Sequence, residues 1–178
     1  MDGSQNYAEY TVEHKAEGKL KQKRILLISL YVLFLVGGMI LFVGVLKIWP
    51  IGAIMPFLTW IIWGLTWRTV QLEHKYEVAS AKLSIYEIYG RKKQIPVFEH
   101  LISDFKIVAP MNDQYKDEYT KADVIIDQRG SIASTDSYFA AFEKDGQRTV
   151  VMFEATNKML KVMKFYNSKN TVVTEVRY

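Results

Sequence analysis

The three histidines are the side chains best suited to bind a metal ion or to move a proton. His14, His74 and His100 lie far apart in the chain, and none has a second ligand at helical or hairpin spacing. Acidic residues cluster in the segment 111–123, but without the spacing and central glycine of a calcium-binding loop. The chain has no cysteine, which excludes disulfides, zinc thiolate sites and thiol nucleophiles. We therefore expect no metal and no other cofactor.

Motifs for covalent catalysis and phosphate binding are also missing. No serine stands in a nucleophile elbow, and no glycine-rich loop is suited to phosphates. The apolar segments described below contain only hydroxyl groups as polar side chains, whereas enzymes and transporters of the membrane use ionisable ones. These hydroxyls belong to Ser29, Tyr31, Thr59 and Thr66. We expect a protein without enzymatic activity, with a small membrane enzyme or transport component as a further alternative.

Two groups of cations are candidate contacts for an anionic ligand. Arg91, Lys92 and Lys93 follow a glycine at an expected strand turn, and Lys158, Lys161 and Lys164 share one face of an expected helix. Residues 68–178 hold 17 cations against 15 anions, a smaller excess than nucleic-acid binding requires. We interpret these groups as solvated surface or as contacts for membrane lipid or a protein partner, and we expect no nucleic acid.

The elements that carry these groups begin with two long apolar segments. Residues 25–46 are uncharged, and as a helix they would extend about 33 Å, enough for a hydrocarbon core of ~30 Å. The run is too long for a signal peptide and is not followed by a cleavage site of small residues. Residues 50–67 form a second uncharged run that starts with Pro50, which fits the first turn of a helix. We predict a two-span transmembrane hairpin over residues 25–67.

All four tryptophans lie in or beside the second span. Trp49 and Trp67 mark its two ends, where interfacial aromatic anchors occur. Trp60 and Trp63 lie deeper, and they either pack on the first span or form a contact surface for another membrane protein. The predicted role of the four residues is therefore membrane-interface contact or helix packing.

Flanking cations predict the orientation of the hairpin. Five cations precede the first span and two follow the second, whereas the connector has Lys47 alone. The positive-inside rule then places both termini in the cytoplasm. We expect residues 1–24 to be a polar cytoplasmic lead-in, loose or helical, and residues 68–178 to be one small cytoplasmic domain.

The segment 68–178 has mostly the pattern of strands. The expected strands include residues 76–78, 83–88, 95–98, 101–108 and 124–126. Pro96 indicates a sheet edge or a bulge, because proline cannot donate to the ladder. The polar segment 111–123 is predicted to be a long loop.

A hairpin and a helix are the clearest local signals of this domain. Asp145-Gly146 joins the apolar runs 138–142 and 149–153, and Asp-Gly between such runs is typical of a β-hairpin. Thr156 is a suitable N-cap for a helix over 157–166, in which apolar residues gather on one face and lysines on the other. We predict an α+β, mainly β domain, a small antiparallel barrel or sheet capped by its C-terminal helix.

The segment YEVASAKLSIYEIYGRKKQIPVFEHLISDFKIV and the ending FEATNKMLKVMKFYN resemble pleckstrin-homology-like (PH-like) domains of small bacterial membrane proteins. The family they resemble has two N-terminal spans and no assigned activity. The resemblance implies a fold and a topology, and it supplies no catalytic residue.

Together these features predict a multi-pass protein of the bacterial plasma membrane that acts as a scaffold or accessory subunit. Its expected partners are membrane lipid and either another protein or a second copy of itself. The alternative is a regulator that senses anionic lipid through the two groups of cations.

Overall fold

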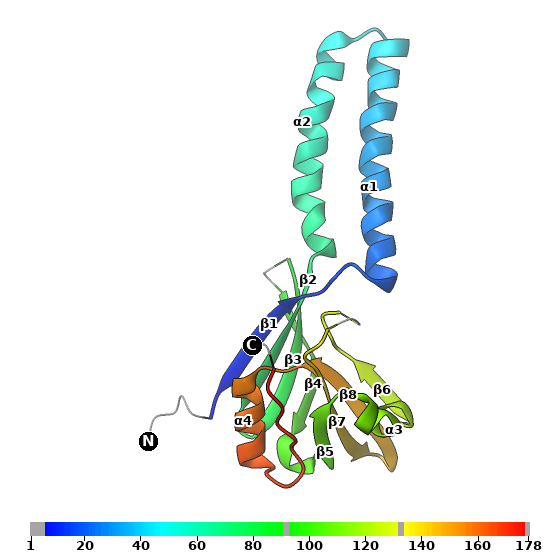
Figure 1. The fold of residues 1–178 in the computed structure, drawn as a ribbon. Helices are drawn as coiled ribbons and strands as arrows, with labels where there is room; N and C mark the ends of the chain where they lie inside the picture. Colours follow the sequence, from blue (N-terminus) through cyan, green and yellow to red (C-terminus); the bar gives the residue numbers. More distant parts are fainter. Residues whose placement is uncertain (1–5, 91–92, 132–133, 177–178) are drawn as a thin grey trace. The chain divides into compact units, whose positions relative to one another are not determined.

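The computed structural model describes residues 6–90, 93–131 and 134–176 (Figure 1). The chain divides into two compact units. The first combines Met1–His14, Glu73–Ile88 and Lys93–Tyr178, and the second combines Lys15–Leu72 with Tyr89–Lys92. The second unit is thus inserted, in sequence, into the first.

Two antiparallel helices form most of the inserted unit (Figure 1). Helix α1 covers Gly18–Met39 and continues as a π-helix, η1, over Ile40–Val45. Helix α2 covers Trp49–Thr66 and is followed by a 3-10 turn, η2, over Trp67–Val70. Both predicted apolar segments are helical, and the first helix begins before the predicted span, within the charged residues that precede it.

Small residues let these two helices approach each other closely. A Cβ atom on Gly38 would lie 2.0 Å from Met55 Cε, and one on Gly52 would lie 2.2 Å from Val43 Cγ2. One hydrogen bond of 2.5 Å joins the hydroxyl groups of Tyr31 and Thr66 across the pair. Two of the four hydroxyl groups noted in the sequence therefore bond to each other.

The first sheet has the strand order β1-β2-β3-β4. Its strands are β1 (Ala8–Glu13), β2 (Leu72–Ala79), β3 (Lys82–Tyr89) and β4 (Lys93–Leu101). The prediction of a loose or helical lead-in is wrong over β1, which pairs antiparallel with β2 and buries Ala8 in the core. Pro96 lies in β4, an edge strand, as predicted.

The second sheet has the order β5-β7-β8-β6. Its strands are β5 (Ile107–Pro110), β6 (Val124–Asp127), β7 (Ser137–Lys144) and β8 (Gln147–Glu154). The predicted hairpin is confirmed as β7–β8, with φ of 53° at Asp145 and 75° at Gly146, as an Asp-Gly turn requires. Strand β6 runs parallel to β8, so the sheet is mixed rather than purely antiparallel.

Two segments differ from the prediction because apolar side chains need to be covered. The expected strand over 101–108 is interrupted by a 3-10 turn, η3 (Ile102–Asp104), which buries Ile102. The expected loop over 111–123 contains the 3-10 turn η4 (Asp113–Tyr115) and the short helix α3 (Lys116–Thr120). The rings of Tyr115 and Tyr119 lie against Phe139 of β7 and cover an apolar patch of the second sheet.

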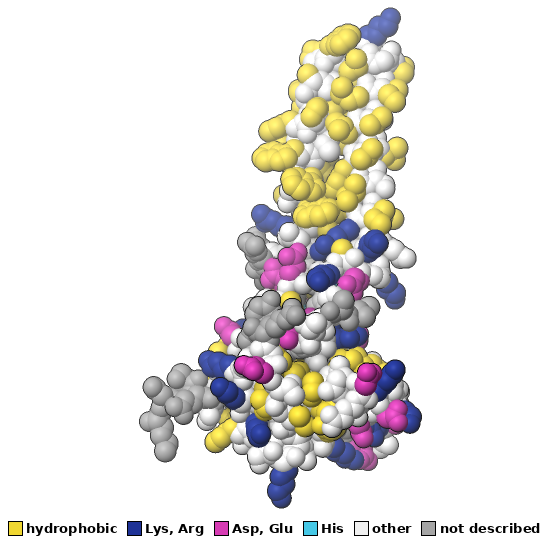
Figure 2. Space-filling model, in the orientation of Figure 1, with side chains coloured by type: hydrophobic (Ala, Val, Ile, Leu, Met, Phe, Trp, Pro, Cys, Tyr) yellow, Lys and Arg dark blue, Asp and Glu magenta, His cyan; other side chains and the backbone are white. Residues whose placement is uncertain are grey.

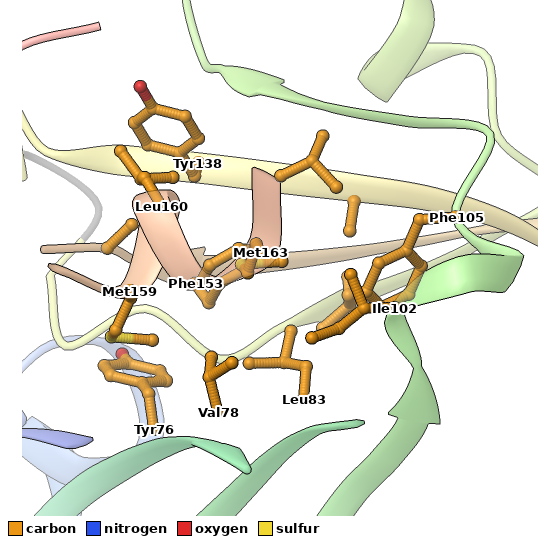
Figure 3. Packing of buried hydrophobic residues seen from close by; sticks show 14 of the residues in the cluster. Tyr76, Val78, Leu83, Ile102, Phe105, Tyr138, Phe153, Met159, Leu160 and Met163 are labelled. Carbon is orange, nitrogen blue, oxygen red and sulfur yellow. The ribbon is translucent and has the colours of Figure 1, made fainter. Parts of the chain in front are cut away.

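Helix α4 covers Asn157–Tyr166, and the Thr156 hydroxyl accepts a hydrogen bond from the backbone N–H of Met159 at 3.3 Å. Its buried residues join both sheets in the main core (Figure 3). They are Met159, Leu160, Val162 and Met163. After α4 the chain runs beside β5, where Val108 donates to Asn170 O and Val172 donates to Val108 O.

Candidate interaction surface

One side of α4 is buried in the core, and the other forms a surface that we call the α4 face. It consists of the exposed side chains Lys158, Lys161, Lys164 and Phe165. The periodicity of the helix brings the three lysines predicted from the sequence onto this face. The helix contains no acidic residue, so none of its own side chains offsets these charges.

Phe165 makes the α4 face partly apolar. Its side chain is 70% exposed, more than any other large hydrophobic residue of the described β-rich unit. It lines a groove of about 350 Å³ together with Asn6, Lys158, Lys161 and Val162. The groove therefore combines an apolar wall with two cationic side chains.

Many other cations of this unit are already paired. Lys75 bonds to Glu9 at 2.9 Å and to Glu77 at 3.3 Å, and Lys82 bonds to Glu99 at 2.6 Å. The hydrogen bond to Glu9 is the largest cause of the raised pKa of Lys75. Among the described residues, no ion pair involves a lysine of the α4 face. The pKa of Glu9 is lowered mainly by its hydrogen bonds, and the charge of Lys158 also helps to lower it.

The other predicted contact residues are distributed differently. Arg91 and Lys92 lie outside the described residues, and Lys93 is the exposed first residue of β4. In the helical pair, Trp49 and Trp60 are 70% and 62% exposed, and Trp63 is also exposed. Trp67 is half-buried, with its ring 6.2 Å from that of Trp63. Trp60 and Trp63 thus lie on the outer surface of the pair.

A second polar arrangement, which the sequence did not predict, lies inside the β-rich unit. We call it the loop network: the segment 127–131, with His74, Tyr76 and Glu154. The carboxylate of Glu154, 6% exposed, accepts the backbone N–H groups of Gly130 at 3.0 Å and Ser131 at 3.3 Å. The hydroxyl of Tyr76 donates to Gln128 O at 2.7 Å. These bonds attach the loop after β6 to both sheets.

Arg129 and Asp127 close the loop network by an ion pair of 2.5 Å. Burial raises the pKa of Asp127, but hydrogen bonds from the Arg129 side chain and backbone outweigh it and leave that pKa lowered. The residues of this network come from distant parts of the chain and carry no motif. Only the non-local pairing of strands brings them together.

His74 lies beside this loop and is 3% exposed. Burial is the main cause of its lowered pKa, and the charge of His14 lowers it further. Glu87, the Arg129 backbone and Asp127 act in the opposite direction. The His14 and His74 rings meet edge to face, with centroids 5.1 Å apart. Two histidines that are remote in the sequence are therefore neighbours, held by β1 and β2.

The surroundings of the histidine pair were searched for further side chains that could bind a metal ion. Within the described ranges, no group of three or more His, Asp and Glu side chains is arranged to hold a metal ion. His100 lies apart from the pair, with its ring 4.2 Å from that of Phe142. Burial lowers its pKa as well.

The fold found here, two β-sheets with a core helix, agrees with a comparison against protein-family models. The model described as bacterial PH-like domain (DUF6106) matches residues 4–173. The chain belongs to this family. The resemblance noted in the sequence is thereby confirmed, and the matched range includes β1 and both apolar helices. No curated protein and no solved structure matched the chain.

The DUF6106 match begins before β1, so it includes this strand with the rest of the domain. The first strand of the PH-like domain stands before the helices in the sequence, and its partner strand β2 stands after them. The helices are long and apolar enough to cross a membrane, by length and composition. The two connections to the helices leave from paired, adjacent strands.

Proposed function

We propose that this PH-like protein is a non-enzymatic scaffold or accessory subunit anchored in the bacterial plasma membrane. One observation carries the proposal: the two helices inserted between β1 and β2 have apolar outer surfaces. Together with η1 and η2, the two helices cover Gly18–Val45 and Trp49–Val70, which are 28 and 22 residues long. In their apolar stretches 0% and 11% of the residues are buried. Figure 2 shows hydrophobic side chains along their outer surface.

Exposed apolar helices of this length are unfavourable in water. Fully burying one leucine, isoleucine or phenylalanine is worth about 1.5–3 kcal/mol, and each helix displays many such side chains. A lipid bilayer removes this cost, and the backbone bonds within a helix satisfy its polar groups there. We therefore propose that α1 and α2 span the membrane as a hairpin.

The flanking charges support a hairpin with both ends of the chain in the cytoplasm. Lys19, Lys21, Lys23 and Arg24 lie in the first two turns of α1, and Arg68 follows α2, whereas the connector has Lys47 alone. The PH-like domain would then be held at the cytoplasmic surface by two connections, through β1 and β2. Such a doubly attached domain is suited to position a partner near the bilayer.

A binding role is supported by the contrast between the buried polar residues and the exposed cations of the domain. In the loop network the buried Glu154 carboxylate and the Tyr76 hydroxyl both bond to the backbone, and so serve the fold. The α4 face instead presents cations and an aromatic ring to the surroundings. We propose that the α4 face is where the domain meets its partner.

Cysteine labelling of the tagged full-length protein tests the anchoring, since the native chain has no cysteine. We expect Lys47→Cys to react with a membrane-impermeant maleimide in intact cells. Lys144→Cys, at the exposed end of β7, should react only after the membrane is permeabilised. Reaction of both from the same side, or release of the protein by alkaline carbonate, would contradict the proposal.

Mild detergent extraction followed by native mass determination tests the scaffold role. A stoichiometric protein companion would support an accessory subunit. The lysines of the α4 face, which form no ion pair with the described residues, also favour a second function, a regulator that senses anionic lipid. A lone protomer that retains anionic lipid would support this second function, unless the lipid is equally retained after Lys158, Lys161 and Lys164 are changed to glutamine.

A further inference from the structure

We propose that the groove of the α4 face binds a short acidic segment of a partner protein, with one apolar side chain of that segment in the groove. This proposal rests on the binding role proposed above and names the chemistry of the partner. It follows from the shape and the apolar content of one surface, and from cations there that form no ion pair with the described residues.

The spacing of the groove residues sets the length of the segment. Lys158, Lys161 and Phe165 stand at positions i, i+3 and i+7 of α4 and so share one side of the helix. At 1.5 Å per residue they extend over about 10 Å. An extended chain covers this distance with about three residues at ~3.3 Å each. The groove therefore fits a short motif in which an apolar residue stands next to acidic ones.

The groove offers a distinct contact to each part of such a motif. Val162 is 4% exposed and contributes an apolar edge, while the Phe165 ring, 70% exposed, stands as a wall. An aromatic or aliphatic side chain placed there would remove Phe165 from water. The ammonium groups of Lys158 and Lys161 would then meet the flanking carboxylates. Because exposed ion pairs contribute little each, both kinds of contact are needed.

A larger groove on the second sheet shows why charge availability matters. It has about 490 Å³ and is lined in part by Lys106, Glu143, Arg148 and Glu118. There each cation already has a carboxylate partner, Lys106 with Glu143 and Arg148 with Glu118. An acidic ligand would have to break these pairs, whereas in the described structure the α4 lysines have none to break.

A hollowed surface with few cations favours a peptide over a bilayer or nucleic acid. A bilayer surface is contacted through dense basic clusters of four to eight residues, and nucleic acid through a stronger basic excess. The α4 face has three lysines around a groove with an apolar wall. One inserted apolar side chain with carboxylates beside it matches these features.

The test uses the full chain in an uncharged maltoside detergent and fluorescein-labelled model peptides. We expect the peptide EEDFDEE to bind in a salt-sensitive way, and EEDSDEE to bind more weakly. The double variant Lys158→Gln/Lys161→Gln should weaken binding about tenfold, the combined effect of two exposed ion pairs. Phe165→Ser should weaken binding of the phenylalanine peptide and leave that of the serine peptide unchanged.

The matched control is Lys144→Gln/Lys169→Gln, which removes the same charge from two exposed lysines outside the groove. It should leave binding of EEDFDEE within about twofold. Equal weakening by both double variants would overturn the proposal in favour of general charge attraction. No binding at millimolar peptide would also overturn it.

Hydrogen exchange distinguishes a bilayer at this surface. If the peptide does not bind, but α4 amides are protected in nanodiscs with phosphatidylglycerol and not with phosphatidylcholine alone, the groove faces lipid. The assay in detergent is independent of topology, so the labelling of Lys47→Cys decides the anchoring separately. A stoichiometric companion unaffected by the α4 variants would preserve the scaffold role and reject this groove.

Discussion

The α4 face and the loop network use similar residue types in opposite ways. In the loop network Arg129 forms an ion pair with Asp127, and the Glu154 carboxylate accepts hydrogen bonds from two backbone N–H groups. On the α4 face, Lys158, Lys161 and Lys164 form no ion pair with the described residues. Burial forces polar groups to be satisfied, because an unpaired buried group is costly, whereas exposed groups are satisfied by water. The comparison indicates that the network holds the fold, and it supports the proposal that the α4 face binds a partner.

The largest expected effect comes from removing the buried carboxylate of the loop network. Glu154→Ala leaves the N–H groups of Gly130 and Ser131 without their acceptor and opens a cavity, so we expect a loss of about 2–4 kcal/mol in unfolding free energy. Thermal unfolding in detergent, followed by circular dichroism, measures it.

Glu143→Ala is the control for this variant, because Glu143 is exposed and, among the described residues, its ion pair is with Lys106. It should change the melting temperature far less than Glu154→Ala does. Similar effects of the two variants would show that the buried Glu154 carboxylate stabilises the fold no more than an exposed one does.

The next effect is a dependence of stability on pH. The pKa of buried His74 is lowered in the folded state, so the unfolded chain takes up protons first as the pH falls. The contribution of His74 to stability is therefore complete above pH about 6.5. It is lost as the pH falls through the folded pKa of His74, by at most about 1.4 kcal/mol per pH unit for one histidine. The carboxylates with lowered pKa act at lower pH, below about 4.5.

His74→Phe tests this dependence and keeps an aromatic ring beside His14 and Tyr76. We expect unfolding free energy to vary less with pH between 4.5 and 6.5 in the variant than in the native chain. The pKa of His100 is also lowered by burial, so His100 contributes a second part of the pH dependence of stability. His100→Phe should remove that part. An unchanged pH profile in both variants would contradict the prediction.

A smaller effect is expected from one hydrogen bond of the loop network. Tyr76→Phe removes the hydroxyl that donates to Gln128 O at 2.7 Å and costs about 1 kcal/mol. Burial raises the pKa of Tyr76, so the hydroxyl stays protonated as a donor. Tyr7→Phe is the control, since Tyr7 bonds to Glu9 at the exposed surface. A larger loss of stability from Tyr7→Phe would reverse the ranking.

The two regions also differ in how far the sequence predicts them. The α4 helix was predicted from the Thr156 N-cap and the periodicity of 157–166, because both signals lie within a few residues of each other. The β7–β8 hairpin followed from Asp145-Gly146 for the same reason. Local chemistry thus predicted where the lysines of the α4 face would lie.

The loop network could not be predicted because it depends on pairing between distant segments. Val12 of β1 pairs with His74 of β2, although the helices of the inserted unit separate the two residues in the sequence. This register brings the His14 ring next to that of His74. Strand β1 itself has alternating burial, with Ala8 in the core and Glu9 exposed. That pattern is too short to identify a strand when its partner lies some sixty residues further along the chain.

The smallest expected effect on stability completes the comparison. Changing Lys158, Lys161 and Lys164 together to glutamine should alter unfolding free energy by no more than about 0.5 kcal/mol, because these side chains are exposed and outside any ion pair with the described residues. The same variant should lose acidic-peptide binding. Thermal unfolding and peptide anisotropy on one preparation measure both quantities. A loss of stability comparable to that of Glu154→Ala would mean that the lysines serve the fold. Binding lost at unchanged stability would separate the two uses of charge in this domain, because the lysines would then act on the partner and not on the fold.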